Sequence, residues 1–217
     1  FTPDGLAVFM HLAPGDYDVT LYFPTLGLSA APRRVTVRTG YNVCPVTLPP
    51  ITLARLTLTV EGTAVTAAEA QLFLLAAAGD RLSPPSAAEE GGPRIALFPG
   101  VYRLALFTEH GYAITELNTA EAKNGTLPVS LALRRGGAAR VLVTNTSEKA
   151  IPGAQVTFSR TIAPGFPVRF TVLLRDPEPQ RTPMLPPGEW TWKAARTGYR
   201  PQSDVVTLSA EEDAELT

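Results

Sequence analysis

The sequence predicts an all-β protein built from tandem antiparallel, immunoglobulin-like β-sandwich modules. Three observations indicate this fold class: a turn motif that recurs at a nearly fixed interval, alternating apolar and polar residues after each turn, and the lack of a convincing amphipathic helix. Alternation with period two is typical of strands half buried in a sheet. Many short strands separated by turn residues are typical of a sandwich.

The recurring turn motif has the pattern Leu-x-Pro-Gly-x-aromatic and occurs at residues 12–17, 97–102 and 185–190. Its glycines, Gly15, Gly100 and Gly188, are 85 and 88 residues apart, which indicates modules of about 85 residues. Proline presets the first corner of a type II turn, and glycine supplies the positive φ that the second corner requires. We therefore predict positive φ at Gly100 and Gly188. A β-branched residue at either position should destabilise its module by more than about 1 kcal/mol.

A strand is expected after each turn, with the aromatic residue on its buried face. The residues predicted to share that face are Tyr17, Val19, Leu21 and Phe23; Tyr102, Leu104 and Leu106; and Trp190, Trp192 and Ala194. A second glycine, at Gly27, Gly111 or Gly198, ends this strand and precedes two more alternating runs. We expect Tyr17, Tyr102 and Trp190 to be mostly buried. Their expected partners are Leu56, Leu58 or Leu72 in the second module and Val141, Val143 or Val156 in the third.

The second and third copies also match upstream of the turn. Residues 54–59 match 139–144, and residues 70–74 match 154–158, at offsets of 85 and 84. We predict strands at these places, including the alanine-rich run 66–78, whose propensity alone would favour a helix.

Two regions between these strands and the turns are irregular and rich in proline. They span residues 79–94 and 163–183. Because proline cannot donate a hydrogen bond to a neighbouring strand, they are predicted to form edge strands or loops.

The repeat predicts three units: residues 1–50 as the C-terminal half of a module, 51–135 as the second module and 136–217 as the third. The first copy lacks about 30 residues of its upstream half, or two to three strands. The chain starts without methionine in mid-pattern, so we interpret it as a window of a longer protein. Left alone, the half module would expose an apolar face and unpaired strand edges. We expect upstream residues to cover it, or a strand donated by a neighbouring subunit, which would make a self-assembling filament.

Composition excludes several classes of function. The chain has 19 basic and 20 acidic residues, so it lacks the basic footprint of a nucleic-acid-binding protein. Cys44 is the single cysteine, which excludes an intrachain disulfide. The sequence contains no run of 18 apolar residues, so no membrane insertion is predicted for this segment.

No residue is predicted to be catalytic, and we do not expect an enzyme. The two histidines, His11 and His110, belong to no motif with a nucleophile or a carboxylate. Cys44 is interpreted as a small buried apolar residue, and no Cys/His cluster has zinc spacing, so no metal or cofactor is expected. Asp16 and Asp18 resemble a calcium-ligand pair. The other copies place Val101, Arg103, Glu189 and Thr191 at those positions, which favours a solvated strand face.

Three further features have structural interpretations. Trp190 and Trp192 could form a sugar-stacking platform, but they align with apolar core positions of the other copies. A Lys–Asn isopeptide bond would need a lysine in the first strand, where Arg55 and Arg140 stand. Asn124 and Asn145 begin glycosylation sequons, a pattern short enough to arise by coincidence.

The chain resembles the carboxypeptidase regulatory-like domains and the related PEGA repeats. The third copy carries the resemblance best, in Pro-Gly-Ala-Gln-Val at 152–156, Pro-Gly-Glu-Trp at 187–190, Thr-Gly-Tyr-Arg-Pro at 197–201 and Val-Val-Thr-Leu at 205–208. The first copy adds Thr-Pro-Asp-Gly at 2–5. Two positions depart from the pattern: Ala68-Glu69 replaces Pro-Gly in the second copy, and Leu28 replaces the tyrosine in the first. The resemblance implies a sandwich of transthyretin or prealbumin type that serves as an accessory, spacer or binding unit of secreted and surface proteins.

The leading functional hypothesis is a non-catalytic structural or adhesive repeat region of a secreted or cell-surface protein, with the periplasm as another location. Its partners would be neighbouring modules or other subunits. The alternative is an accessory module of a larger secreted enzyme or receptor, with a glycan or protein ligand. Further copies in the flanking sequence would favour a stalk, whereas an adjoining catalytic domain would favour an accessory module.

Overall fold

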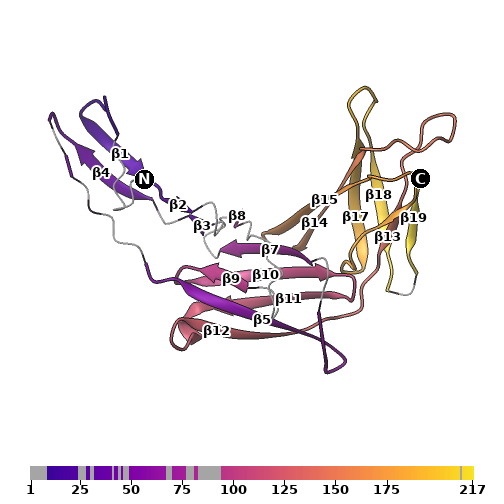
Figure 1. Cartoon of the computed structure of the whole chain (residues 1–217), viewed down its shortest axis with the longest axis horizontal. Coiled ribbons are helices and arrows are strands. Elements are labelled where there is room, and N and C mark those ends of the chain that lie inside the picture. The colour runs from indigo at the N-terminus through magenta and orange to yellow at the C-terminus, as the bar shows by residue number, and fades with distance from the viewer. Residues whose placement is uncertain are drawn as a thin grey trace.

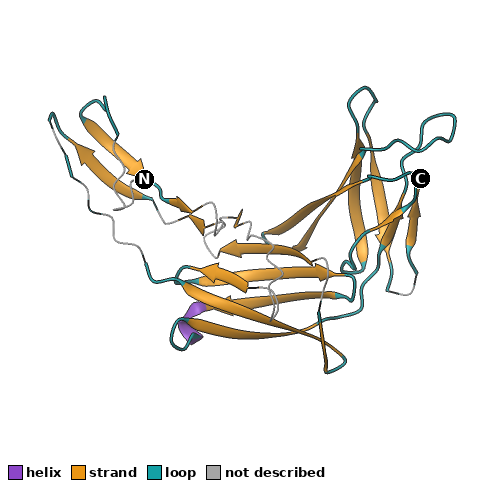
Figure 2. Ribbon diagram, viewed as in Figure 1, coloured by secondary structure: helices purple, strands orange, loops and turns teal. Residues whose placement is uncertain are grey.

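The computed structural model describes residues 9–23, 28–29, 32–40, 42–43, 45, 49–66, 70–76, 81–82, 94–210 and 212–217. These residues form strands and one 3-10 turn, η1 (Thr119–Glu121), and they contain no α-helix (Figures 1 and 2). The all-β prediction is confirmed. The alanine-rich run, whose propensity alone favoured a helix, contains strand β7 (Ala70–Ala76).

The second module consists of two sheets. One has the strand order β11-β10-β7-β8, and the other has the order β12-β5-β6, with β9 also paired to β5. The strands are β5 (Thr52–Val60), β6 (Thr63–Val65), β7, β8 (Arg81–Leu82), β9 (Arg94–Leu97), β10 (Val101–Thr108), β11 (Tyr112–Asn118) and β12 (Thr126–Ala132).

The third module repeats this arrangement except for β6, whose place is taken by the single bridge Thr144↔Ala150. Its sheets have the orders β15-β14-β17-β18 and β16-β13-β19 (Figure 1). The strands are β13 (Ala139–Val141), β14 (Gln155–Ala163), β15 (Phe166–Leu173), β16 (Gln180–Arg181), β17 (Gly188–Ala195), β18 (Gln202–Leu208) and β19 (Ala214–Leu216). The matched segments at 54–59 and 139–144 therefore begin equivalent modules, as predicted. The predicted boundaries at 50/51 and 135/136 stay predictions.

Each of these two modules contains one parallel strand pair, which the sequence did not predict. Strand β12 runs parallel to β5, and β19 runs parallel to β13, whereas the other strand pairs among the described residues are antiparallel. Hydrophobic alternation is the same in either direction, so it carries no information on strand direction. Parallel neighbours need a long crossover, and here the whole module lies between its first and last strands.

The proline-rich regions form edge strands, as predicted. Strand β15, which contains Pro167, and strand β8 each lie at one edge of their sheet, and β16 lies at the edge of the other sheet of the third module. Residues 77–80 and 83–93 lie outside the described residues.

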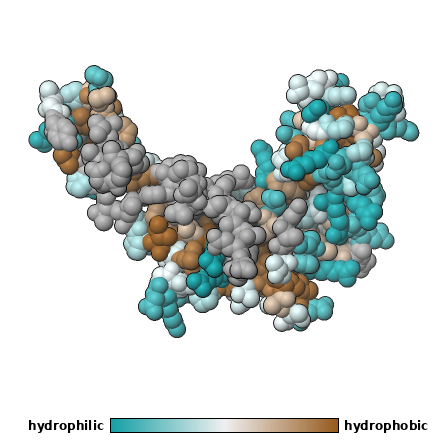
Figure 3. All heavy atoms as spheres, viewed as in Figure 1, coloured by the Kyte–Doolittle hydropathy of each residue, from teal (hydrophilic) through white to brown (hydrophobic). Residues whose placement is uncertain are grey.

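The first region has only two short strand pairs. Strand β1 (Gly15–Val19) pairs with β4 (Arg33–Val37), and β2 (Tyr22–Phe23) pairs with β3 (Leu28–Ser29). None of the described side chains between residues 9 and 50 is buried. Apolar surface is visible around β1 and β4 in Figure 3. What covers this face stays a prediction, as does the incompleteness of the first copy.

The register across the turn motif is the same in all three copies. The aromatic residue faces an aliphatic residue on the neighbouring strand, in the pairs Tyr17↔Val35, Tyr102↔Leu117 and Trp190↔Val206. The three aromatic residues, which the sequence repeat aligned with one another, therefore have equivalent neighbours.

The turn glycines have positive φ but do not adopt the predicted type II geometry. Their φ values are 159° at Gly15, 158° at Gly100 and 119° at Gly188, not the value near +80° of a type II turn. The first two are close to extended backbone, and only Gly188 lies well inside the region that disfavours side chains. The glycine instead stands at the start of the strand, where a Cβ at Gly15 or Gly100 would be in ordinary van der Waals contact with the aromatic ring of the motif. A Cβ added at Gly100 would lie 3.6 Å from the Tyr102 ring.

The aromatic residue of the motif closes the turn with a hydrogen bond to the carbonyl oxygen four residues earlier. Tyr17 Oη donates to Ala13 O at 2.8 Å, Tyr102 Oη donates to Phe98 O at 2.9 Å, and Trp190 Nε1 donates to Pro186 O at 3.0 Å. Tyrosine and tryptophan supply such a donor on an apolar ring, and phenylalanine does not. This bond explains why the motif uses only tyrosine and tryptophan.

Tyr102 and Trp190 occupy the expected cores. Tyr102 belongs to the cluster that contains Leu56 and Leu58, with Leu72 packed against it. Trp190 is fully buried in the cluster that contains Val141 and Val156, with Val143 packed against it. The burial prediction is confirmed for these two residues. It is wrong for Tyr17, which is only half-buried, because β1 has one neighbouring strand and no opposing sheet among the described residues.

Candidate functional site

The joint between the second and third modules is built by the outer face of β7 and β10. Ala105 and Phe107 of β10, and Phe73 and Leu75 of β7, point away from the core of their own module and join the core of the third. The Phe107 side chain is completely buried. Its ring centroid lies 6.1 Å from that of Trp190 and 6.4 Å from that of Phe170.

The joint was not predicted, because β10 was expected to alternate between apolar and polar residues. The signal was present in two unbroken apolar runs, Leu-Ala-Leu-Phe at 104–107 and Leu-Phe-Leu-Leu-Ala at 72–76. Continuous apolar runs are typical of strands that are buried on both faces.

Hydrogen bonds reinforce the joint at its margins. Met184 N donates to Thr108 O at 2.9 Å, and Arg103 Nη1 donates to Pro164 O at 2.6 Å. Both bonds connect the second module to the third.

The segment that connects the second module to the third, residues 134–137, is fixed at both of its ends. At its start, Tyr112 and Arg134 exchange backbone hydrogen bonds of 2.9 and 2.8 Å, and at its end Gly137 and Leu185 exchange bonds of 3.0 and 2.8 Å. The backbone approaches so closely that a Cβ at Gly137 would lie 2.3 Å from the carbonyl oxygen of Ser209. The connection is therefore a fitted part of the joint and not a loose linker.

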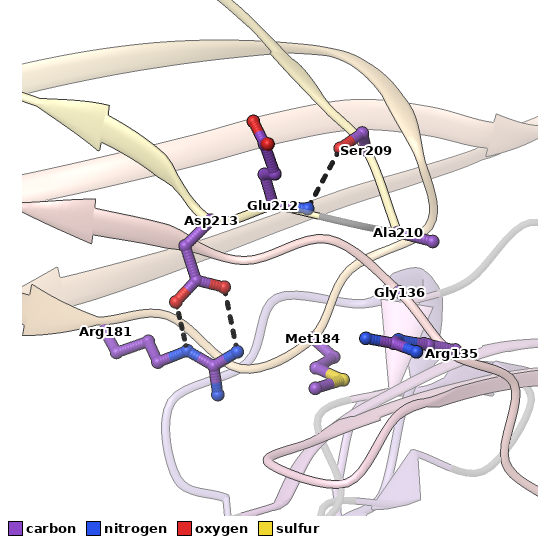
Figure 4. A pocket seen from close by; sticks show the side chains of 8 residues that line it. All are labelled: Arg135, Gly136, Arg181, Met184, Ser209, Ala210, Glu212 and Asp213. Carbon is purple, nitrogen blue, oxygen red and sulfur yellow. Dashed lines mark hydrogen bonds and ion pairs between the residues drawn. The ribbon is translucent and has the colours of Figure 1, made fainter.

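A small hollow of about 50 Å³ lies beside this segment (Figure 4). Its lining residues are Arg135, Gly136, Arg181, Met184, Ser209, Ala210, Glu212 and Asp213. Arg181 donates two hydrogen bonds to Asp213, of 2.8 and 2.9 Å, and Arg140 Nε lies 3.5 Å from the same carboxylate. The hydrogen bond from Arg181 is the main reason that the pKa of Asp213 lies below its usual range, while burial opposes this shift. This pair fastens the start of β19 to β16 and offers no group poised for general acid–base chemistry.

A larger groove of about 280 Å³ lies between the two sheets of the third module, and we call it the end groove. Half-buried Trp192 and Val143 contribute to its wall. Its lining residues are 141–146, Val156, Trp192, Ala194, Gln202, Leu216 and Thr217.

The two histidines lie in different modules, and the structure does not bring them together. His11 is exposed, with φ of 63°, in the first region. His110 Nε2 lies 3.2 Å from Thr66 O and 3.5 Å from Glu109 in the second module. Cys44 lies outside the described residues.

The aspartate pair is exposed, and each carboxylate has a partner on the neighbouring strand. Asp16 accepts a hydrogen bond of 2.7 Å from Thr36 Oγ1, and Asp18 lies 3.7 Å from Arg34. The two aspartates therefore behave as cross-strand pairing residues. Among the described residues, no group of three or more His, Cys, Asp or Glu could hold a metal ion.

The tryptophans do not form an open platform. Trp190 is fully buried, while Trp192 is half-buried at the end groove. Asn124 is exposed in the turn before β12. Asn145 is half-buried, and its Oδ1 accepts backbone hydrogen bonds from Ser147 and Lys149.

The first strands carry arginines at the positions considered for an isopeptide bond. Arg55 is exposed on β5, and Arg140 of β13 lies within ion-pair distance of Asp213 and Glu215. In the part of the chain that the structure describes, no helix is long and apolar enough to cross a membrane.

No family model matches the sequence, and no curated protein matches it. The solved structures to which the chain is similar include the following three. The Bacillus anthracis TIE protein is 18% identical, with a TM-score of 0.30, and the match covers 94% of this chain and 41% of that one. A streptococcal ancillary pilin is 18% identical, with a TM-score of 0.25, and the match covers 95% and 75%. The pilus adhesin SpaC from Lactobacillus rhamnosus GG is 12% identical, with a TM-score of 0.28, and the match covers 74% and 26%. The chain thus spans less than half of the TIE protein and about a quarter of SpaC. The resemblance to carboxypeptidase regulatory-like and PEGA repeats stays a prediction.

Proposed function

We propose that this chain is a non-catalytic structural and adhesive repeat region of a secreted or cell-surface protein, where it acts as a spacer or stalk. The observation that supports this proposal is the joint, in which Phe107 of the second module is buried in the core of the third. A spacer must hold its two ends at a fixed separation and pass force from one module to the next.

The joint meets that requirement in physical terms. Domains within one chain move relative to one another unless their interface is large and hydrophobic. Here the interface is apolar at its centre, hydrogen-bonded at its margins and joined by a fitted segment. The second and third modules should therefore behave as one rigid body. Assembly with neighbouring subunits is part of the proposal, because the first region leaves apolar side chains exposed.

A distance measurement between the two modules tests the proposal. The native thiol is removed by Cys44→Ser, and cysteines for spin labels are introduced by Ser130→Cys in β12 and Ser203→Cys in β18, both at exposed sites. The labels report the distance between the second and third modules. A rigid spacer gives one narrow distance distribution, and Phe107→Ser broadens it. Val205→Ser, at an exposed site in the third module, serves as the control and leaves it unchanged. A broad distribution in the unsubstituted background would contradict the spacer role.

The alternative is a carbohydrate- or protein-binding accessory module, and the end groove favours it. Aromatic rings beside polar side chains are typical of ligand sites, and Trp192 lies there near Asn145 and Gln202. Titration with oligosaccharides, followed by tryptophan fluorescence, distinguishes the two functions. A saturable change that Trp192→Phe weakens would support an accessory module, and a flat response would favour the spacer.

A further inference from the structure

The first and last strands of the second module lie side by side and run in the same direction. Strand β12 pairs with β5 over all of its seven residues. The pairing continues past both ends of β12, because Leu53 N donates to Gly125 O and Leu133 N donates to Thr59 O, each at 2.8 Å. The two strands therefore form one unbroken parallel ladder.

The chain enters and leaves the second module through this ladder. Residues 49–51 lead directly into β5, and residues 133–137 lead from the end of β12 to the third module. Because the strands are parallel, the start of β5 and the end of β12 lie at opposite ends of the ladder (Figure 1). A pull along the chain therefore drags the two strands past each other along their common axis.

The direction of a pull decides how the hydrogen bonds of a ladder are loaded. When two strands are dragged past each other, every bond carries part of the force, so the bonds must break together. When two strands are peeled apart from one end, the force falls on one bond at a time. The bonds of a parallel ladder are evenly spaced, so a pull along the chain loads the whole β5–β12 pair at once.

The core side chains of the two strands prevent the ladder from slipping. Leu56 and Leu58 of β5, and Leu127 and Leu131 of β12, lie in the second core with exposed fractions of 1% to 5%. A slip of β12 by one residue would turn its apolar side chains to the solvent face. The next register that keeps them inside lies two residues away, about 7 Å along the strand. The ladder therefore has no neighbouring register in which it could yield gradually.

We propose that the β5–β12 pair is a shear clamp, which carries tensile load through the second module and sets the force at which this module unfolds. This inference rests on the spacer role, in which the chain passes force between its ends. The load continues into the fitted segment 134–137, where Arg134 and Tyr112 exchange backbone hydrogen bonds directly after β12. The clamp resists stretching of the second module, whereas the joint resists bending between the modules.

Pulling the same protein in two directions with optical tweezers tests the clamp. In the full chain with Cys44→Ser, handles attached through Ile51→Cys and Arg134→Cys load the ladder in shear. The comparison protein carries Ile51→Cys and Lys123→Cys. Lys123 forms a bridge with Thr126 at the start of β12, so it lies at the same end of the ladder as residue 51, and the force peels the strands apart from that end. All three attachment sites are exposed.

At one pulling speed, unfolding in the shear direction should need at least about twice the force that the peeling direction needs, because forced unfolding follows the barrier along the path of the pull. Equilibrium stability cannot produce this difference, since the two proteins differ only at exposed attachment sites. Their denaturant unfolding curves should coincide. The length released in each event is set by the residues between the attachment sites, and it identifies the event as unfolding of the second module.

A matched pair of core variants shows whether the ladder itself resists the force. Leu131 of β12 and Leu117 of β11 are both 3% exposed in the same core, but only Leu131 belongs to the clamp. Leu131→Ala should lower the force in the shear direction. Leu117→Ala should leave most of that force in place, although it removes the same atoms from the core.

Equal forces in the two pulling directions would overturn the proposal, as would equal losses of shear force in the two alanine variants. Either result would mean that the whole core, and not the ladder, resists the pull. The spin-label distance is judged separately. A narrow distance combined with equal forces would keep the spacer role and remove the clamp. A broad distance combined with unequal forces would remove the spacer role and leave a ladder that resists shear.

Discussion

The second and third modules share a strand order but use the outer faces of equivalent sheets differently. In the second module, the outer face of β7 and β10 is apolar, through Phe73, Leu75, Ala105 and Phe107, and it packs on the third module. The equivalent positions of β14 and β17 are Thr157, Ser159, Lys193 and Ala195, none of them buried. Thr157 forms a hydrogen bond of 3.0 Å with Thr171 on the same face.

This difference separates what a module needs to fold from what it needs to join a neighbour. The third module pairs an apolar inner face with a polar outer face, and its core takes in Phe107 and the neighbouring side chains of the second module. A second apolar face, on two strands only, adds a joint. The two cases differ in sequence: apolar and polar residues alternate in β17, whereas β10 contains a continuous apolar run.

The largest expected effect comes from removing the residue that joins the modules. Phe107→Ala should lower the free energy of unfolding by about 3–5 kcal/mol, the range for a fully buried phenylalanine. Denaturant unfolding should also separate into two transitions, because each module loses its shared core. Thr157→Ala, on the equivalent face of the third module, should change stability by less than about 0.5 kcal/mol. Equal losses of stability in the two variants would contradict the conclusion that only the second module uses its outer sheet face as a joint.

A slightly smaller effect is expected in the connecting segment. Gly137→Ala should cost about 1–3 kcal/mol, because its Cβ would lie 2.3 Å from Ser209 O and the backbone would have to shift. Gly165, in the turn between β14 and β15, has a φ of 70° and open space around it. Gly165→Asn should therefore cost less than about 1 kcal/mol, since asparagine tolerates this conformation. Thermal unfolding of both variants measures the difference, and a larger loss at Gly165 would mean that the segment is loose.

The positions of equivalent strands along the chain could be predicted from the sequence because turn residues and alternation repeat. The matches at 54–59 with 139–144, and the copies of the Pro-Gly turn, located equivalent strands correctly. The joint was missed for a physical reason: alternation was used to find one buried face, and Phe107 lies on the other. The parallel pairing of β12 with β5 and of β19 with β13 could not be predicted, because strand direction leaves no mark on the hydrophobic pattern.

The comparison of repeat copies also decided how far the candidate functional residues could be predicted. Comparing copies separated core from solvated positions, as at Trp190 and Asp16, since equivalent residues share an environment. The ion pair between Arg181 and Asp213 joins residues 32 positions apart. The second module lacks this pair, because Thr126 stands there at the place of Asp213. Repeat analysis therefore gave no signal for it.

The turn hydrogen bond allows a finer comparison between a buried and an exposed copy of one interaction. Burial is the main reason that the pKa of Tyr102 is raised, and its hydroxyl donates to Phe98 O inside the second core. Tyr102→Phe should therefore cost about 1–2 kcal/mol, because a buried hydrogen bond is lost. Tyr17→Phe should cost less than about 0.5 kcal/mol, because water replaces the bond at the half-buried site. Denaturant unfolding of each variant measures the costs, and equal losses would mean that the turn bond is independent of burial.

The smallest expected effect is a pH dependence that the third module has and the second lacks. The pKa of Asp213 is lowered in the folded state, first by its hydrogen bond from Arg181, so the unfolded chain binds this proton more tightly. The pair therefore contributes stability in full at neutral pH, and the contribution is lost as pH falls below the ordinary aspartate range and through the folded pKa. We expect Asp213→Asn to cost about 0.5–1 kcal/mol at pH 7, the scale of a surface ion pair, and to cost progressively less in acid. Urea unfolding of both proteins from pH 7 to pH 3 measures this difference. A cost that stays constant from pH 7 to pH 3 would contradict this expectation. It would show that the geometry of the hydrogen bonds, and not the charge of Asp213, holds β19 in place, because asparagine does not titrate and keeps only part of that geometry.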